Sequence, residues 1–358
     1  MLTEEVFRDN ITSSNQDSKN TASALLFDAY SKNPATESNQ WKPLPPTQDL
    51  NPAVITEKTA ENERNRQSDK TSHVELDENP TLAMGLATPC YKWQDKSVEP
   101  KGAVLLIHGF PAHGKVYDHL ASKLAAEGYV VYAPDLRGLG RAYSTGLAPK
   151  LDYTGATDGD LAILADRIRK ENKGLPLMVG GESMGGAFSI RLAALHPEFV
   201  DGLILSGAAI KNVPHYIGLF PQSFRNLVGP RHPQVDFSNQ IRKYFSDDPR
   251  ITNDLLRDPL VRKRFDVSEL TQCRAVSRDT VGLVSSVRPN IPVLLLQSVD
   301  DMQTSARRSM RVYDHELRST DFTPVILPPR GHILIESPYV QKDVEDTVVN
   351  WLNKKTRR

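Results

Sequence analysis

The chain has 358 residues, with 44 basic and 44 acidic side chains that give a formal net charge of zero. This balance favours neither nucleic acid nor an anionic membrane as a partner. Two cysteines, Cys90 and Cys273, are too few for a secreted disulfide framework and lack the spacing of a zinc site. The first residues lack the apolar core of a signal peptide, and no apolar run approaches the ~20 residues that span a bilayer. We expect a soluble, cytoplasmic protein.

Residues 1–73 are rich in polar side chains, and their sparse apolar residues follow no sustained period. Such a stretch buries too little apolar surface to offset the entropy lost on ordering. We predict a disordered or loosely packed N-terminal extension. Residues 22–30 form the exception, because they could make a helical turn or two and dock elsewhere.

Six short apolar runs follow from about residue 82 onward. They are continuous rather than alternating, which is typical of strands buried on both faces of a parallel sheet. Residues 87–93 predict an additional antiparallel strand at the edge of that sheet. The six runs span residues 103–108, 129–133, 177–181, 202–206, 291–296 and 324–327.

Helical patterns separate these runs. Leu161, Leu164 and Ile168 fall on one helical face, with Asp158 or Asp160 as the expected cap. Residues 340–352 predict a closing helix. Because strands and helices alternate, we predict an α/β core with a mostly parallel sheet flanked by helices, formed by residues 82–210 and 289–354.

Residues 211–288 interrupt the alternation, since they contain no convincing strand. Apolar and aromatic residues at 216–228 precede charged segments with a helical pattern. We predict a mostly helical insertion. It could cover the carboxyl ends of the strands as a lid, because ligands of open α/β sheets bind at that edge.

The strongest chemical signal is the sequence Gly-Glu-Ser-Met-Gly around Ser183, which matches G-x-S-x-G. It directly follows a predicted strand and precedes a predicted helix, the context in which this motif presents a nucleophile. A turn this sharp needs small neighbours, which Gly181 and Gly185 supply. We therefore predict that Ser183 is a nucleophile.

A serine hydroxyl needs a base, and His332 is the best candidate. It follows the last apolar run in a glycine-containing loop, which places it at the same sheet edge as Ser183. A carboxylate should orient this base. Asp300 and Asp301 both follow the fifth run, and the chain order Ser, Asp, His is the one expected for such a site. From the residues alone, either aspartate could face His332.

Two backbone N–H groups are needed to hold an oxyanion. We expect one from Met184, which follows the nucleophile, and one from Phe110 in the loop after the first run. His108 lies in the same loop, where a structural hydrogen bond is its expected role.

Four motifs resemble the monoacylglycerol lipase and lysophospholipase branch of the α/β-hydrolases, a serine-hydrolase branch. They are HGFPAH at 108–113, DLRGLG at 135–140, GESMGG at 181–186 and RGH at 330–332. Residues 247–249 and 258–260 of the insertion also resemble that branch. The resemblance implies the α/β-hydrolase fold with a helical lid. It places the acid four residues after Gln297, at Asp301, although Ser298 stands where the family has glycine and a one-residue slip would select Asp300.

The resemblance implies an esterase that forms an acyl-enzyme on Ser183, with Asp301 and His332 completing a triad. Family members act on monoacylglycerols, lysophospholipids and small acyl esters, without a metal or cofactor. The apolar stretch 216–228 would suit an acyl chain, a peripheral membrane contact or simple packing on the core. Two alternatives stay open: an acyltransferase or thioesterase with the same triad, and a non-catalytic scaffold whose N-terminal extension binds a partner.

Overall fold

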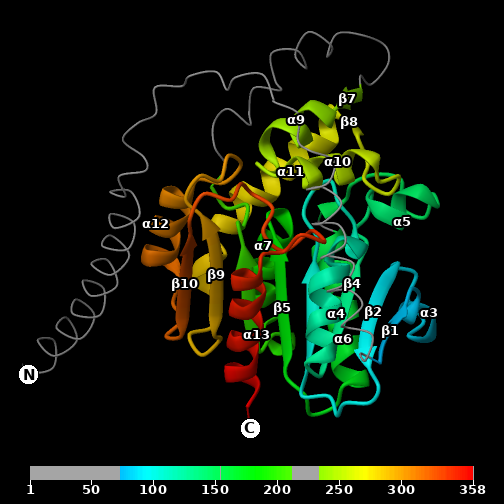
Figure 1. Ribbon diagram of the computed structural model, residues 1–358, viewed down its shortest axis with the longest axis vertical. Helices are drawn as coiled ribbons and strands as arrows, with labels where there is room; N and C mark the ends of the chain where they lie inside the picture. Colours follow the sequence, from blue (N-terminus) through cyan, green and yellow to red (C-terminus); the bar gives the residue numbers. More distant parts are fainter. Residues whose placement is uncertain (1–72, 154, 212–233, 358) are drawn as a thin grey trace, which may run out of the picture.

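The computed structural model describes residues 73–153, 155–211 and 234–357 (Figure 1). The predictions for the N-terminal extension, except at its last residue, and for the apolar stretch 216–228 therefore lie outside the described residues. Eight strands form one sheet in the order β1-β2-β4-β3-β5-β6-β9-β10. They are β1 (Val74–Asp77), β2 (Cys90–Asp95), β3 (Gly102–Ile107), β4 (Tyr129–Pro134), β5 (Leu177–Glu182), β6 (Gly202–Ser206), β9 (Val293–Ser298) and β10 (Phe322–Leu327).

The six apolar runs form the six parallel strands of this sheet, from β4 to β10, as predicted. The antiparallel strand β2 pairs with β4, but it does not lie at the edge. Strand β1 pairs with its outer side, with Val74 opposite Asp95. The edge position predicted for residues 87–93 is therefore wrong. The short strand β1 escaped prediction because it has only four residues, and its two apolar side chains, Val74 and Leu76, are too few to establish a period.

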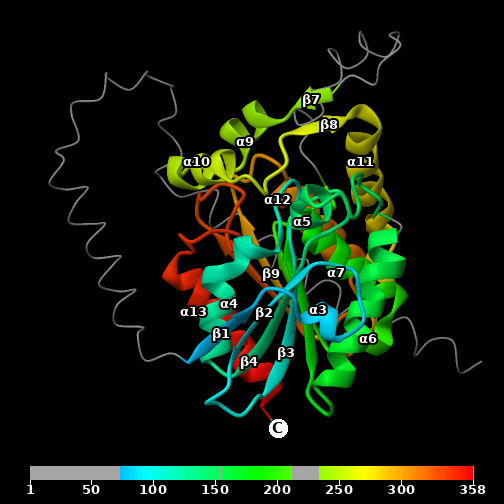
Figure 2. The ribbon, with the colours of Figure 1, turned by 90° about the vertical axis from the view of Figure 1, so that its right-hand side faces the viewer.

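Helices cover both faces of the sheet (Figure 2). Side chains alternate along each buried strand. In β3, Ala103 and Leu105 join one apolar cluster, and Val104 and Leu106 join the other. Helices α4 and α13 pack on the second cluster, and α6, α7 and α12 pack on the first. These helices are α4 (Asp118–Ala126), α6 (Ala162–Glu171), α7 (Met184–Leu195), α12 (Ala306–Glu316) and α13 (Lys342–Thr356).

The predicted cap of α6 is wrong. A π-helical turn over Gly155–Leu161 leads directly into α6, so the backbone is already helical there and no side chain caps it. Asp160 instead accepts hydrogen bonds from Arg137 at 2.7 and 2.9 Å. The remaining short helical segments are α3 (Pro80–Ala83), α5 (Gly140–Ser144), Gly114–Tyr117, Pro197–Phe199 and Val284–Ser286.

Residues 234–288, called the cap segment here, lie over the carboxyl ends of the parallel strands (Figures 1 and 2). They contain three helices, as expected, but also two three-residue strands that pair antiparallel. The expectation of no strand in this region is therefore wrong, because strands this short carry no readable periodicity. The elements are β7 (Gln234–Asp236), α9 (Ser238–Tyr244), α10 (Pro249–Arg257), β8 (Arg264–Asp266) and α11 (Val267–Val281).

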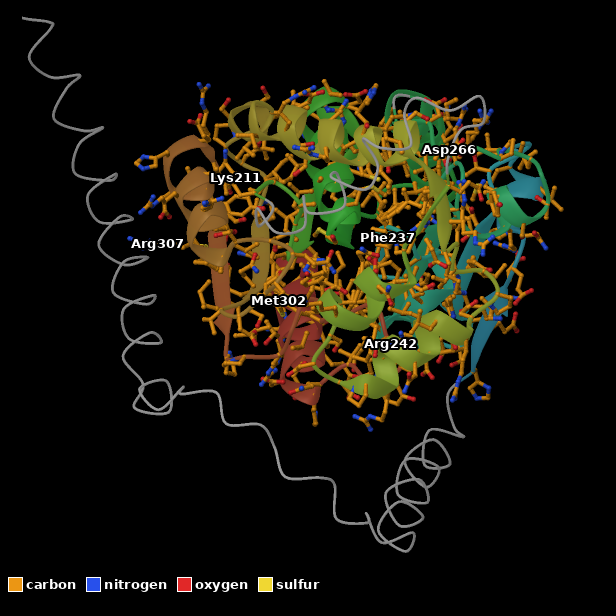
Figure 3. The ribbon with its side chains drawn as sticks, turned by 90° about the horizontal axis from the view of Figure 1, so that it is seen from above. Lys211, Phe237, Arg242, Asp266, Met302 and Arg307 are labelled. Atoms are coloured by element: carbon orange, nitrogen blue, oxygen red, sulfur yellow. The ribbon has the colours of Figure 1, made fainter. Side chains whose placement is uncertain are left out.

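Aromatic packing joins the cap segment to the core. The ring of Phe110, in the loop after β3, contacts the rings of Phe237 and Phe265, with centroids 5.1 and 4.4 Å apart. In the view from above, Phe237 lies between Met302 and Asp266, near the middle of the molecule (Figure 3). The cap segment thus rests directly on the loops that follow the strands.

Candidate active site

Ser183 lies at a sharp turn between β5 and α7. Its backbone has φ 54° and ψ −117°, a positive φ that a non-glycine residue seldom adopts. A Cβ atom on Gly181 or Gly185 would lie 2.2 or 1.7 Å from the carbonyl oxygen of Ile107, so both positions require glycine. The backbone of Ser183 is held by hydrogen bonds to Ser206 O and from Ala209 N, both at 2.8 Å. The predicted strand–turn–helix context is present.

His332 follows β10 on a loop, and its side chain is fully buried. Its Nδ1 atom lies 2.8 Å from Oδ2 of Asp301, which is also buried. The other ring nitrogen, Nε2, is buried and has no hydrogen-bond partner among the residues that the structure describes. A neutral His332 that donates from Nδ1 to Asp301 keeps the lone pair of Nε2 free to accept a proton.

The two aspartates that follow β9 have different contacts. Asp301 Oδ2 also accepts hydrogen bonds from Thr304 Oγ1 (2.6 Å) and Gln297 Nε2 (3.1 Å). Asp300 instead accepts from Arg330 N at 3.0 Å and Gly331 N at 3.3 Å. Asp301 is therefore the aspartate that faces His332, whereas Asp300 holds the backbone of the loop that carries it.

The charges of this pair support each other. Burial raises the pKa of Asp301. His332 and the hydrogen bonds from Thr304 lower this pKa by more than burial raises it, so the net value lies below the ordinary one. Burial lowers the pKa of His332, but Asp301 and then Glu182 raise it, so the net shift is upward. Asp301 is thus a carboxylate at neutral pH, and it stabilises the imidazolium that forms when His332 accepts a proton.

A small cavity of about 30 Å³ borders Ser183, with room for roughly one water molecule. Both expected oxyanion residues, Phe110 and Met184, line it. Helix α11 of the cap segment also contributes to its wall, which the sequence did not predict at residue level. The other lining residues are Ala209, Cys273, Val276, Ser277, Gln303 and Thr304.

His108 has a structural environment. Its ring is buried, Nδ1 lies 2.9 Å from Gly109 O, and Nε2 accepts from Leu136 N at 3.1 Å. Burial lowers its pKa to about 4, so it is neutral at neutral pH. Both ring nitrogens are occupied by backbone groups, which fix the loop that leads to Phe110.

Two buried glutamates behind the site, Glu182 and Glu336, had not been predicted as site residues. Glu182 is the last residue of β5, directly before Ser183, and Glu336 lies four residues after His332 on the same loop. The available signal was the presence of a charged residue at the end of an otherwise apolar strand. Within the described ranges, no group of three or more His, Cys, Asp or Glu residues is arranged to hold a metal ion.

A family of hydrolases described as serine aminopeptidase, S33, matches residues 98–338, which is more than half of the chain. The chain belongs to this family. This hydrolase is 27% identical over 259 residues to the monoacylglycerol lipase of Mycolicibacterium smegmatis, covering 71% of this chain and 89% of that protein. It is 25% identical over 270 residues to the monoglyceride lipase of Mus musculus, covering 74% and 86%.

Solved structures share the fold of this chain. A soluble variant of the monoglyceride lipase of Saccharomyces cerevisiae has a TM-score of 0.64 at 22% identity, covering 76% of this chain and 94% of that one. The monoacylglycerol lipase of Paleococcus ferrophilus has a TM-score of 0.59 at 23% identity, covering 75% and 100%. The predicted α/β-hydrolase fold of this hydrolase is confirmed. Across its described part, no helix is both long and apolar enough to cross a membrane.

Proposed function

We propose that this hydrolase cleaves carboxylic esters of lipid-like substrates through an acyl-enzyme on Ser183. The observation that carries the proposal is the buried Asp301–His332 pair with a free Nε2, on the loops beside the strained turn of Ser183. Sequence likeness to proteins named monoacylglycerol lipase and monoglyceride lipase supports the substrate class.

In the proposed first half-reaction, Ser183 Oγ attacks the ester carbonyl carbon while His332 Nε2 accepts the hydroxyl proton. The oxyanion of the tetrahedral intermediate accepts hydrogen bonds from the N–H groups of Phe110 and Met184. When the intermediate collapses, the C–O bond to the alcohol breaks and His332 returns its proton to the leaving oxygen. Asp301 keeps the imidazole in the required tautomer and stabilises its charged form.

In the proposed second half-reaction, a water molecule replaces the alcohol. His332 accepts a proton from that water as it attacks the acyl carbon, and then returns the proton to Ser183 Oγ, which releases a carboxylic acid. We propose that residues 211–288 act as a lid domain on the core, since α11 lines the cavity beside Ser183. An acyl acceptor other than water would make the same site an acyltransferase, and a thioester substrate would make it a thioesterase.

The substrate proposal is tested with p-nitrophenyl esters from acetate to palmitate, monoacylglycerols, lysophospholipids and acyl-coenzyme A thioesters. An aminoacyl p-nitroanilide tests the amide hydrolysis that the family description names. We expect ester hydrolysis by the wild type and no turnover by Ser183→Ala. Exclusive turnover of the amide or the thioester would overturn the proposed substrate class, and catalytic activity of any kind would exclude the pure scaffold.

A further inference from the structure

Glu182 holds the loop that carries His332. Its Oε1 atom accepts hydrogen bonds from Ser206 Oγ at 2.6 Å and from Leu334 N at 2.8 Å. Its Oε2 atom accepts from Ile335 N at 3.2 Å and Glu336 N at 3.0 Å. The residue before the nucleophile is therefore bonded to three consecutive N–H groups that begin two residues after the base.

Glu336 extends this connection to the loop of the oxyanion hole. Its Oε1 atom accepts from Gly109 N, the residue before Phe110, and from Tyr117 Oη at 2.9 Å. The same hydroxyl oxygen of Tyr117 accepts from Glu182 N at 3.1 Å. All three side chains are buried. The network thus joins the nucleophile turn, the base loop and the oxyanion loop.

The two carboxyl groups have different environments. Glu182 faces four donors, namely three backbone N–H groups and the Ser206 hydroxyl. This environment suits an ionised carboxylate, because a carboxylate only accepts hydrogen bonds. Burial raises the pKa of Glu182, and the net shift stays upward although His332 and the hydrogen-bond donors lower it in part. Burial and the neighbouring Glu182 raise the pKa of Glu336 well above its ordinary value. Within the described residues, donors reach both oxygens of Glu182 but only Oε1 of Glu336, so the charge is assigned to Glu182 and the proton to Glu336.

We infer that Glu182 is a positioning residue for His332: a second buried carboxylate that orients the base loop and stabilises the imidazolium. A neutral Glu336 links this base loop to the oxyanion loop. The inference rests on the proposed function, since it assigns His332 as the base. A buried carboxylate costs free energy unless fully paired. Both oxygens of Glu182 accept hydrogen bonds, and most of the donors lie on the loop that carries His332, which the reaction requires in a fixed position.

The titratable groups around the His332 loop come from three elements. Asp301 lies on the loop after β9, Glu182 lies at the end of β5, and Glu336 follows on the loop of His332 itself. Asp300 lies against the backbone of this loop through Arg330 N and Gly331 N. The ring of Phe245 covers the imidazole edge-on, at 6.4 Å between centroids. Asp301 and Glu182 are the two anions that raise the pKa of His332.

The test measures the second-order rate of fluorophosphonate labelling of Ser183 as a function of pH, because its acid limb reports the pKa of the base in the free enzyme. In Glu182→Gln the charge is lost, so the limb should move to lower pH by about 0.5 to 1. The amide nitrogen also opposes the N–H groups of 335 and 336, so the plateau rate should fall about 10- to 100-fold. Glu336→Gln is the matched control, because an amide is isosteric with a neutral acid, and its limb should stay at the wild-type pH.

Circular dichroism melts establish that each variant folds. If Glu182→Gln does not fold, Glu182→Asp separates charge from reach: the limb should stay in place while the rate falls about 10-fold or more. The inference would be overturned if Glu182→Gln kept both the acid limb and the plateau rate of the wild type. It would also be overturned if the acid limb of Glu182→Asp moved to lower pH, or if that of Glu336→Gln moved as far as that of Glu182→Gln. Absence of labelling in the wild type at every pH would instead refute the proposed function, so the two failures are distinguishable.

Discussion

The Oδ2 atom of Asp301 lies 2.8 Å from Nδ1 of His332, and both side chains are buried. This contact fixes the imidazole tautomer, because the proton on Nδ1 must point at the carboxylate. It also separates the roles of two adjacent aspartates, since Asp300 bonds to the backbone of Arg330 and Gly331 instead. The assignment of the acid therefore follows from geometry that a one-residue change in register would destroy.

Asp301→Asn should lower kcat by about 10³-fold or more, because an amide that donates to Nδ1 selects the wrong tautomer. Asp300→Asn is the matched control. It keeps an oxygen that can accept from Arg330 N and Gly331 N, so we expect a loss of less than about 10-fold. Steady-state hydrolysis of a p-nitrophenyl ester gives both values. A larger loss in Asp300→Asn would show that the acid has been assigned to the wrong residue.

The pH dependence of the reaction should report the raised pKa of His332. Burial alone would lower this pKa, but Asp301 and Glu182 raise it above the ordinary value of about 6.5. Because the base must be neutral, kcat/KM should fall on the acid side with a midpoint above that value. A midpoint at or below it would contradict the electrostatic account.

The raised pKa of His332 also affects stability, but the stabilisation is lost as pH rises, whereas the activity is lost as pH falls. A histidine whose pKa is raised in the folded state binds its proton more tightly there, so it stabilises the fold below its unfolded pKa and loses this effect as pH rises through the folded pKa. The free energy of unfolding of the wild type should therefore exceed that of His332→Gln by more at pH ~5.5 than at pH ~8.5. Urea unfolding of both proteins at the two pH values measures this difference.

The buried ion pair between Arg262 and Glu269 should be a main link between cap segment and core. Its two N–O distances are both 2.7 Å, and each partner also bonds to a core loop, at Gly138 O and Leu151 N. Arg262→Met leaves a buried carboxylate unpaired and should cost about 3–5 kcal/mol of unfolding free energy. Arg250→Met breaks the exposed pair with Asp248 and should cost about 0–1 kcal/mol. If urea unfolding gave equal losses of unfolding free energy for Arg262→Met and Arg250→Met, the buried pair would contribute no more to stability than the exposed one.

The turn at Ser183 should tolerate no side chain at Gly185, where a Cβ would lie 1.7 Å from Ile107 O. Gly185→Ala should therefore destabilise the fold by more than about 4 kcal/mol or prevent folding. Gly159→Ala serves as the control, since its Cβ would have no neighbour within 4 Å among the described residues. Thermal melts of both variants measure the loss of stability. A Gly185→Ala protein with wild-type stability would contradict the described turn.

The sequence was most informative where a local rule applies. Continuous apolar runs predicted the six parallel strands, and small residues on both sides of Ser183 predicted the sharp turn. Strand β1 was missed because four residues, of which only Val74 and Leu76 are apolar, are too short a stretch to establish a strand period. The strands of the cap segment were too short to show a period.

Choices that depend on tertiary contact could not be read from the chain. Asp300 and Asp301 are neighbours, and only the path of the loop after β9 decides which one meets His332. The bond between Glu182 and Glu336 N joins positions 154 residues apart, a closeness that the fold creates and no spacing rule predicts.

The central claim is that the hydroxyl of Ser183 is the nucleophile and that His332 activates it. The most direct test is labelling with a fluorophosphonate probe, followed by mass spectrometry of the modified peptide. We predict one adduct on Ser183 in the wild type, none in Ser183→Ala, and a rate reduced about 10³-fold or more in His332→Ala. Labelling that persists in Ser183→Ala, or that stays at the wild-type rate in His332→Ala, would contradict the account.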